Sequence, residues 1–142
     1  MRAIIVGASA GVGRALSEAL AARGDALLLV ASDLRDLDPQ AASLRLKHGA
    51  QVEVLAADAR RPEEFLSSIA SAARAFGDPQ LLLLPIGVSR NDDSGTLPLE
   101  ETRTLIDTNL VSIVSVVGHF LPFMLAANRG CIVGFGSVAR YS

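Results

Sequence analysis

The segment Ile4–Arg14 has the sequence IIVGASAGVGR and joins a short aliphatic run to the start of a helical pattern. Gly7, Gly11 and Gly13 fall at positions i, i+4 and i+6 of this segment. A tight strand-to-helix turn needs residues without a Cβ atom, and the first turn of a helix presents unpaired N–H groups to an anion. The segment therefore predicts a phosphate-binding turn. The alternative is that the glycines only allow the helix to pack closely on the sheet.

Apolar runs of strand length alternate with helical patterns along the whole chain, which favours βαβ units and a parallel sheet. The predicted strands are about Ala3–Val6, Ala26–Val30, Val52–Leu55, Leu81–Leu84 and Cys131–Phe135. The predicted helices cover about 12–23, 40–48, 62–76 and 100–127, with Pro122 as a candidate bend in the last one. The pattern predicts an α/β, three-layer, doubly wound Rossmann fold with a mostly parallel sheet. One domain spans residues 1–142 and stops after a fifth strand.

Composition excludes several classes of protein. The 142 residues carry a net charge of −2 and half of them are hydrophobic, so no basic surface for nucleic acid is expected. The single cysteine, Cys131, excludes an internal disulfide framework and is expected to pack as a small hydrophobic residue. His48 and His119 are far apart and no Cys/His cluster has metal-binding spacing, so no metal site is predicted.

The sequence favours a cytoplasmic location. Its apolar N-terminal run is short and ends in glycines, unlike a secretory signal. The stretch from Leu110 to Ala127 is interrupted by serines, a glycine, a histidine and a proline, so we expect a buried helix rather than a membrane span.

The Gly-x-x-x-Gly-x-Gly spacing at Gly7 resembles the cofactor motif of the short-chain dehydrogenases/reductases, and the resemblance extends over nearly the whole chain. It implies an NAD(P)-binding domain. Asp58 and Ala59 match the place where the family's aspartate contacts the adenine. Asn109 matches the family's asparagine that holds a water in a proton relay, and Ser137 matches the catalytic serine. The full set of predicted cofactor contacts is Gly7, Ser9, Ala10, Gly11, Val12, Gly13, Arg14, Ser32, Asp33, Asp58, Ala59 and Gly87.

The choice between NAD and NADP depends on the end of the second strand, where an acid binds the ribose diol of NAD and a basic residue accommodates the NADP phosphate. Asp33 lies twenty residues after the last glycine of the motif, but the family alignment puts the NAD-type acid at Ala31 and the NADP-type arginine at Ser32. Neither marker is present. Ser32, Arg35 and Arg14 could surround a 2′-phosphate, which favours NADP. Asp33 could instead be a turn or capping residue, and Arg14 could belong to a solvated helix face.

Two departures from the family pattern are visible. The family's Asn-Asn-Ala-Gly segment is replaced by LPIG at 84–87, which keeps Gly87 and loses both amide side chains. The family's Tyr-x-x-x-Lys is absent. Tyr141 lies only four residues after Ser137 and no lysine follows it, so we reject it as the catalytic tyrosine.

Three functions follow from the resemblance and its gaps. The first is an oxidoreductase, or its N-terminal part, that transfers hydride between nicotinamide and an unidentified small carbonyl or alcohol substrate. The second is a non-catalytic NAD(P)-binding module, acting as a sensor or an assembly partner. A methyltransferase fits the glycine spacing poorly.

An apolar edge strand and an exposed face of the long helix favour association with another part of a protein. We therefore expect either that the chain is a fragment or that partners cover these surfaces, and the family resemblance implies a homo-oligomer.

Overall fold

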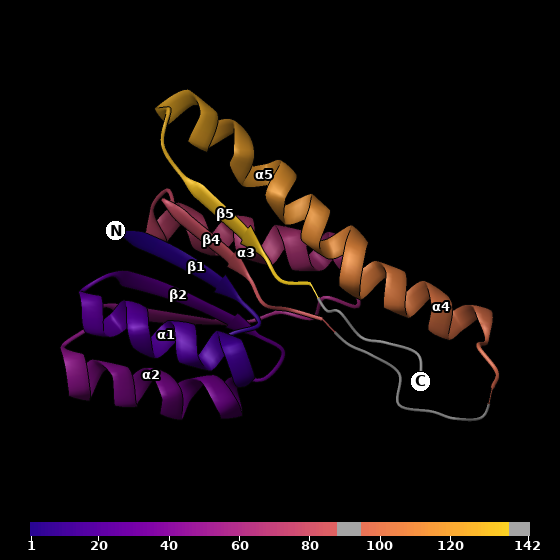
Figure 1. The fold of residues 1–142 in the computed structure, drawn as a ribbon, viewed down its shortest axis with the longest axis horizontal. Helices are drawn as coiled ribbons and strands as arrows, with labels where there is room; N and C mark the ends of the chain where they lie inside the picture. The colour runs from indigo at the N-terminus through magenta and orange to yellow at the C-terminus, as the bar shows by residue number, and fades with distance from the viewer. Residues whose placement is uncertain (88–94, 137–142) are drawn as a thin grey trace.

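A computed structural model describes residues 1–87 and 95–136 (Figure 1). Five strands form one sheet: β1 Arg2–Val6, β2 Ala26–Ala31, β3 Val52–Ala56, β4 Leu81–Leu84 and β5 Cys131–Gly134. The strand order is β3-β2-β1-β4-β5, and every neighbouring pair is parallel. The predicted doubly wound α/β fold is confirmed, and each predicted strand lies within one residue of its observed bounds.

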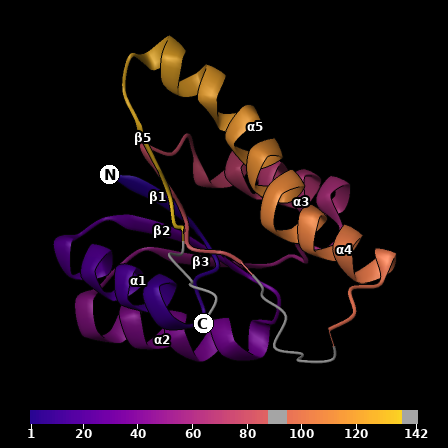
Figure 2. The same cartoon turned by 45° about the vertical axis from the view of Figure 1, so that its right-hand side comes forward.

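Helices cover both faces of the sheet (Figures 1 and 2). Helices α1 (Gly11–Arg23) and α2 (Leu34–His48) lie on one face, where they pack on strand residues such as Ile5 and Leu29. Helices α3 (Pro62–Phe76) and α5 (Ser112–Ala127) lie on the other, where they pack on residues such as Ile4 and Leu28. Because neighbouring residues of a strand point to opposite faces, the continuous aliphatic runs of β1 and β2 fill both cores.

Helix α2 begins at Leu34, six residues before the predicted start at Gln40. The sequence suggested a turn because Asp33–Pro39 is polar and contains a proline. In the structure the Asp33 side chain caps the helix by accepting a hydrogen bond of 2.8 Å from the backbone N–H of Arg35. Pro39 lies inside the helix, where it removes one backbone donor. Burial of Leu37 and the cap outweigh that loss.

The long helix predicted over about 100–127 is present, but the expectation that its stretch Leu110–Ala127 is buried is wrong. Helix α4 (Leu99–Ile106) continues through a π-helical turn, η1 (Asp107–Val111), into α5. The 29-residue segment has a window of mean hydropathy 2.1, so length and composition alone would allow a membrane span, and only 22% of that window is buried. Its buried residues in α5 recur every four positions and face α3 and the sheet. One stripe of the helix is therefore core and the rest is exposed.

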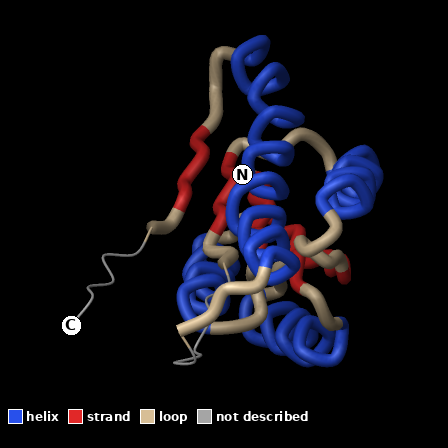
Figure 3. Tube along the Cα trace, turned by 90° about the vertical axis from the view of Figure 1, so that its right-hand side faces the viewer, coloured by secondary structure: helices blue, strands red, loops and turns tan. Residues whose placement is uncertain are grey.

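Cys131 is exposed, not packed in the core as predicted. Among the described strands β5 is one of the two edge strands, with β4 as its only neighbour, and Figure 3 shows it at one side of the sheet. The apolar sequence of a strand does not say whether a further strand or helix covers it, and here no described strand pairs with the outer edge of β5.

Replacing Asp33 with alanine should lower the free energy of unfolding by about 1 kcal/mol, the usual cost of losing a capping side chain. Asp33→Asn should cost much less because asparagine caps equally well. Chemical denaturation of both variants measures the difference, with Asp38→Ala, on the exposed part of α2, as the control. Equal losses for the alanine and asparagine variants would contradict the capping role.

Candidate functional site

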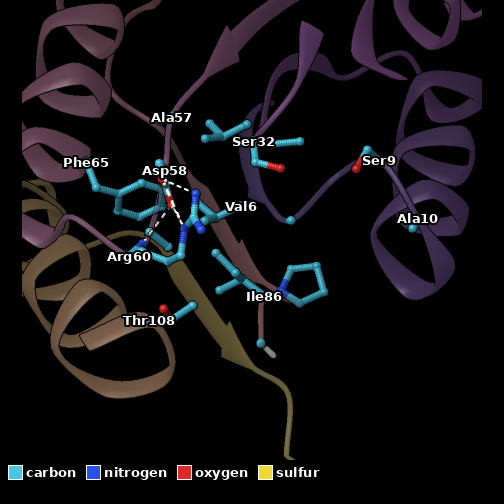
Figure 4. Close-up of a pocket in the computed structure, with 16 residues that line it drawn as sticks. Val6, Ser9, Ala10, Ser32, Ala57, Asp58, Arg60, Phe65, Ile86 and Thr108 are labelled. Atoms are coloured by element: carbon cyan, nitrogen blue, oxygen red, sulfur yellow. Dashed lines mark hydrogen bonds and ion pairs between the residues drawn. The ribbon is translucent and has the colours of Figure 1, made fainter. Parts of the chain in front are cut away.

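A cavity of about 460 Å³ opens at the carboxyl ends of β1 to β4. The strand order reverses between β1 and β4, and such a switch point is where ligands bind in doubly wound sheets. Figure 4 shows the cavity, with the loop after β3 on one side and the turn before α1 on the other. The lining residues are Val6, Gly7, Ser9, Ala10, Val30, Ala31, Ser32, Ala57, Asp58, Ala59, Arg60, Phe65, Pro85, Ile86, Gly87 and Thr108.

Gly13 and Gly11 have different structural roles in the glycine turn. A Cβ atom on Gly13 would lie 1.9 Å from the carbonyl oxygen of Gly7, so α1 can pack against the turn only without one. Gly11 has a φ of +52°, and a Cβ atom there would meet nothing within 4 Å. The packing interpretation of the glycines therefore holds for Gly13, whereas Gly11 borders open space.

The N-terminus of α1 is left without a cap from the protein. Its N-cap residue is Ala10, which makes no side-chain cap bond, and the first turn carries no acidic residue. The N–H groups of Gly11, Val12 and Gly13 have no acceptor within the helix, and the helix dipole adds partial positive charge there. These amides form an anion-binding position, with the side chain of Val12 exposed beside it.

The earlier amides of the turn serve the fold instead. The N–H groups of Gly7 and Ala8 both donate to the carbonyl oxygen of Val30, at 2.8 and 3.0 Å. The buried Gln40 of α2 donates from Nε2 to the carbonyl oxygen of Ala8 at 3.0 Å. Sequence analysis gave Gln40 no role, and only its place on the buried face of a helix could have indicated one.

Asp58 lies at the end of the cavity formed by the loop after β3 and is paired with Arg60, which the sequence analysis missed. Nε of Arg60 lies 3.1 Å from each Asp58 oxygen, and Nη2 lies 2.9 Å from Oδ2 (Figure 4). These hydrogen bonds hold the pKa of Asp58 below its ordinary value and raise that of Arg60. Ala59 is buried, and its carbonyl oxygen accepts a 2.6 Å hydrogen bond from Ser112 of α5.

The structure brings Asn109 and Gly87 together at the cavity mouth. Oδ1 of Asn109 lies 3.4 Å from the position that a Cβ atom on Gly87 would occupy. Asn109 belongs to η1, and its neighbour Thr108 is buried and lines the cavity. π-Helical turns often occur at functional sites because they shift side chains relative to an α-helix. The other predicted catalytic residue, Ser137, lies outside the described residues.

The residues predicted to distinguish NAD from NADP occupy separate places. Ser32 lines the cavity. The Asp33 carboxylate accepts from Nε and Nη2 of Arg35, at 2.8 and 2.6 Å, which lowers the pKa of Asp33 and raises that of Arg35. Arg14 lines a different groove between α1 and α2 that also includes Gly11. The cavity includes Gly7, Ser9 and Ala10 of the glycine turn, whereas the groove includes Gly11.

A parallel sheet with a glycine turn and an uncapped helix at its switch point defines a Rossmann-type nucleotide-binding domain. The chain belongs to the short chain dehydrogenase family, whose profile matches residues 1–141.

Individual relatives agree with this assignment. Over 142 residues the chain is 31% identical to an uncharacterised oxidoreductase of Myxococcus xanthus (strain DK1622), covering 98% of this chain and 54% of that protein. Over 136 residues it is 31% identical to the 3-oxoacyl-(acyl-carrier-protein) reductase FabG of Escherichia coli (strain K12), covering 96% and 54%. A short-chain dehydrogenase from Sphingobium yanoikuyae, solved in complex with NADPH, superposes with a TM-score of 0.88 at 32% identity, covering 96% and 53%. The chain thus spans about half the length of these relatives.

Gly13→Ala and Gly11→Ala should differ sharply in stability. The Gly13 variant places a methyl group inside the contact distance of a backbone oxygen, so it should lose about 3 kcal/mol or more of unfolding free energy. The Gly11 variant meets only backbone strain and should lose about 1–2 kcal/mol. Thermal and chemical unfolding measure both. A Gly11 variant as unstable as the Gly13 variant would contradict this division.

Proposed function

We propose that the chain is the cofactor-binding part of an NADP(H)-dependent oxidoreductase that transfers hydride between nicotinamide and a carbonyl or alcohol substrate. One observation carries this proposal: Gly7, Ser9 and Ala10 of the glycine turn line the cavity at the switch point of the sheet, and α1 begins directly after them without a side-chain cap. Two further findings support it, because the named relatives include oxidoreductases and one solved relative holds NADPH.

The residues present fit a dinucleotide. The amides of the first turn of α1 would hold the pyrophosphate, and the open space beside Gly11 gives it a close approach to the backbone. Asp58, ionised at neutral pH, would accept a hydrogen bond from the adenine amino group. The nicotinamide end would extend toward Gly87 and Asn109.

The nicotinamide supplies or accepts the hydride when the cofactor is bound. In the reducing direction the substrate's carbonyl carbon gains the hydride and its oxygen gains a proton. Asn109, on the rigid frame of η1, would hold a water on the path of that proton. Ser137 is proposed to hydrogen-bond the substrate oxygen, as the family resemblance implies.

We propose NADP(H) rather than NAD(H) because of the groups that follow β2. Ser32 offers a small hydroxyl at the cavity wall, and Arg35 lies three residues further along the chain, with a side chain that is 89% exposed. An exposed guanidinium can turn from Asp33 to a phosphate, whose geometry it matches. Asp33 caps α2, so its carboxylate is already engaged and is a poor acceptor for a ribose diol.

Arg35→Ala should weaken NADPH binding about tenfold and leave NADH binding within about twofold, since a hydrogen bond to a charged group contributes about 1.5 kcal/mol. Quenching or enhancement of the fluorescence of the reduced nicotinamide measures both affinities. Arg74→Ala, on α3 and outside the cavity lining, is the control. Equal losses for the two cofactors, or no loss for NADPH, would contradict the assignment of Arg35.

The second candidate is a cofactor-binding module without catalysis. The glycine turn and the cavity that support cofactor binding are common to both candidates. NADPH oxidation with a panel of ketones and aldehydes separates the two candidates. Turnover by this chain or by a longer form of it supports the enzyme, and binding without turnover by either form supports the module. Failure to bind either reduced cofactor would overturn both. The homo-oligomer and the cytoplasmic location stay predictions.

A further inference from the structure

We propose that Arg60 clamps the adenine base by laying its guanidinium plane over the exposed face of the ring. This inference rests on the proposed dinucleotide site and adds a residue that the glycine motif and Asp58 do not indicate. Arg60 lines the cavity, and its side chain is 69% exposed, which places it at the mouth.

The floor of the same part of the cavity is apolar and rigid. Val6 and Val30 are buried to 1% and 0% exposure, and Ile86 and Phe65 complete the lining. A flat heteroaromatic ring placed there would have one face against aliphatic carbon and the other toward the mouth. A planar cation at the mouth suits that second face, because a guanidinium stacks on aromatic rings as well as attracting their π electrons.

Two sets of contacts hold Arg60 in place before any ligand binds. Asp58 fixes the guanidinium plane through Nε and Nη2, which leaves both faces of that plane unused by these hydrogen bonds. The backbone of the loop is fixed by the bond from Arg60 N–H to Asp58 and by the bond from Ser112 to Ala59. A pre-ordered side chain loses little rotamer freedom on binding, so more of the stacking energy contributes to affinity.

The neighbouring arginine has a different environment. Nη1 of Arg61 lies 3.7 Å from Oε2 of Glu64. Arg61 lines a separate groove together with Pro62, Asp107 and Val111. Arg60 and Arg61 carry equal charge, and both side chains are about 70% exposed. Arg61→Ala is therefore a matched control that removes a positive charge next to the site without removing the clamp.

The test compares Arg60→Ala, Arg60→Lys and Arg60→Tyr in the affinity for NADPH or NADH, whichever the unaltered chain binds more tightly. Arg60→Ala should weaken binding about threefold to tenfold, which is the effect expected when one cation–π or stacking contact between partly desolvated groups is lost. Arg60→Tyr keeps a planar surface and should bind within about twofold of the unaltered chain. Arg60→Lys keeps the charge without the plane and should resemble the alanine variant.

A second measurement replaces adenine with hypoxanthine in the cofactor. Stacking tolerates changes at the edge of a base, so Arg60→Ala should weaken binding of the hypoxanthine and adenine forms by the same factor. Far-UV circular dichroism and thermal unfolding check that each variant is folded, and Arg61→Ala should bind like the unaltered chain.

Three outcomes would overturn the inference. If Arg60→Lys binds normally and Arg60→Tyr does not, the charge matters and the plane does not. If the loss depends on the base, Arg60 contacts its edge. If no Arg60 variant weakens binding while the unaltered chain binds the cofactor, the clamp is wrong and the proposed function stands. Absence of binding by the unaltered chain would instead overturn the proposed function.

Discussion

The site depends on one close approach between two backbone segments, the first turn of α1 and the turn that follows β1. Gly13 lies so near the carbonyl group of Gly7 that no side chain fits between them. This contact holds the uncapped N-terminus of α1 beside the carboxyl ends of the strands, where the cavity lies. Gln40 braces the same turn from α2 through the carbonyl group of Ala8. Backbone packing thus positions the predicted anion site, and no long side chain is needed to reach the ligand.

The topology supplies the other half of the site. Because the chain crosses from β1 to β2 on one face and reaches β4 by way of α3 on the other, the helices diverge above β1 and β4. Ser112 then links the two halves, since its hydroxyl on α5 donates to Ala59 in the loop that carries Asp58 and Arg60. The adenine end of the proposed site is therefore held by a helix that follows it by fifty residues in the chain.

Local sequence predicted the elements well where pattern and packing agree. Helix α3 and strand β4 have their predicted bounds because Pro62, Gly77 and a pure leucine run mark them clearly. The start of α2 was missed because Pro39 outweighed the capping signal of Asp33. Arg60 and Gln40 were missed because their roles come from contacts across space. Burial of Cys131 was overestimated for the same reason. An apolar pattern indicates that a segment can pack in a core, but it does not show whether another element lies against that segment.

The long helix carries Asn109 and several exposed apolar side chains. Leu110, Val114 and Leu125 on it are more than half exposed, while Val116 on the opposite side is fully buried. Exposed apolar surfaces often mark sites of association with another molecule. Whatever covers these side chains packs on the same helical segment that carries Asn109, and η1 lies where the exposed face, the core stripe and the cavity mouth meet. The segment is continuous from Leu99 to Ala127, so the exposed apolar side chains and η1 belong to one helical element.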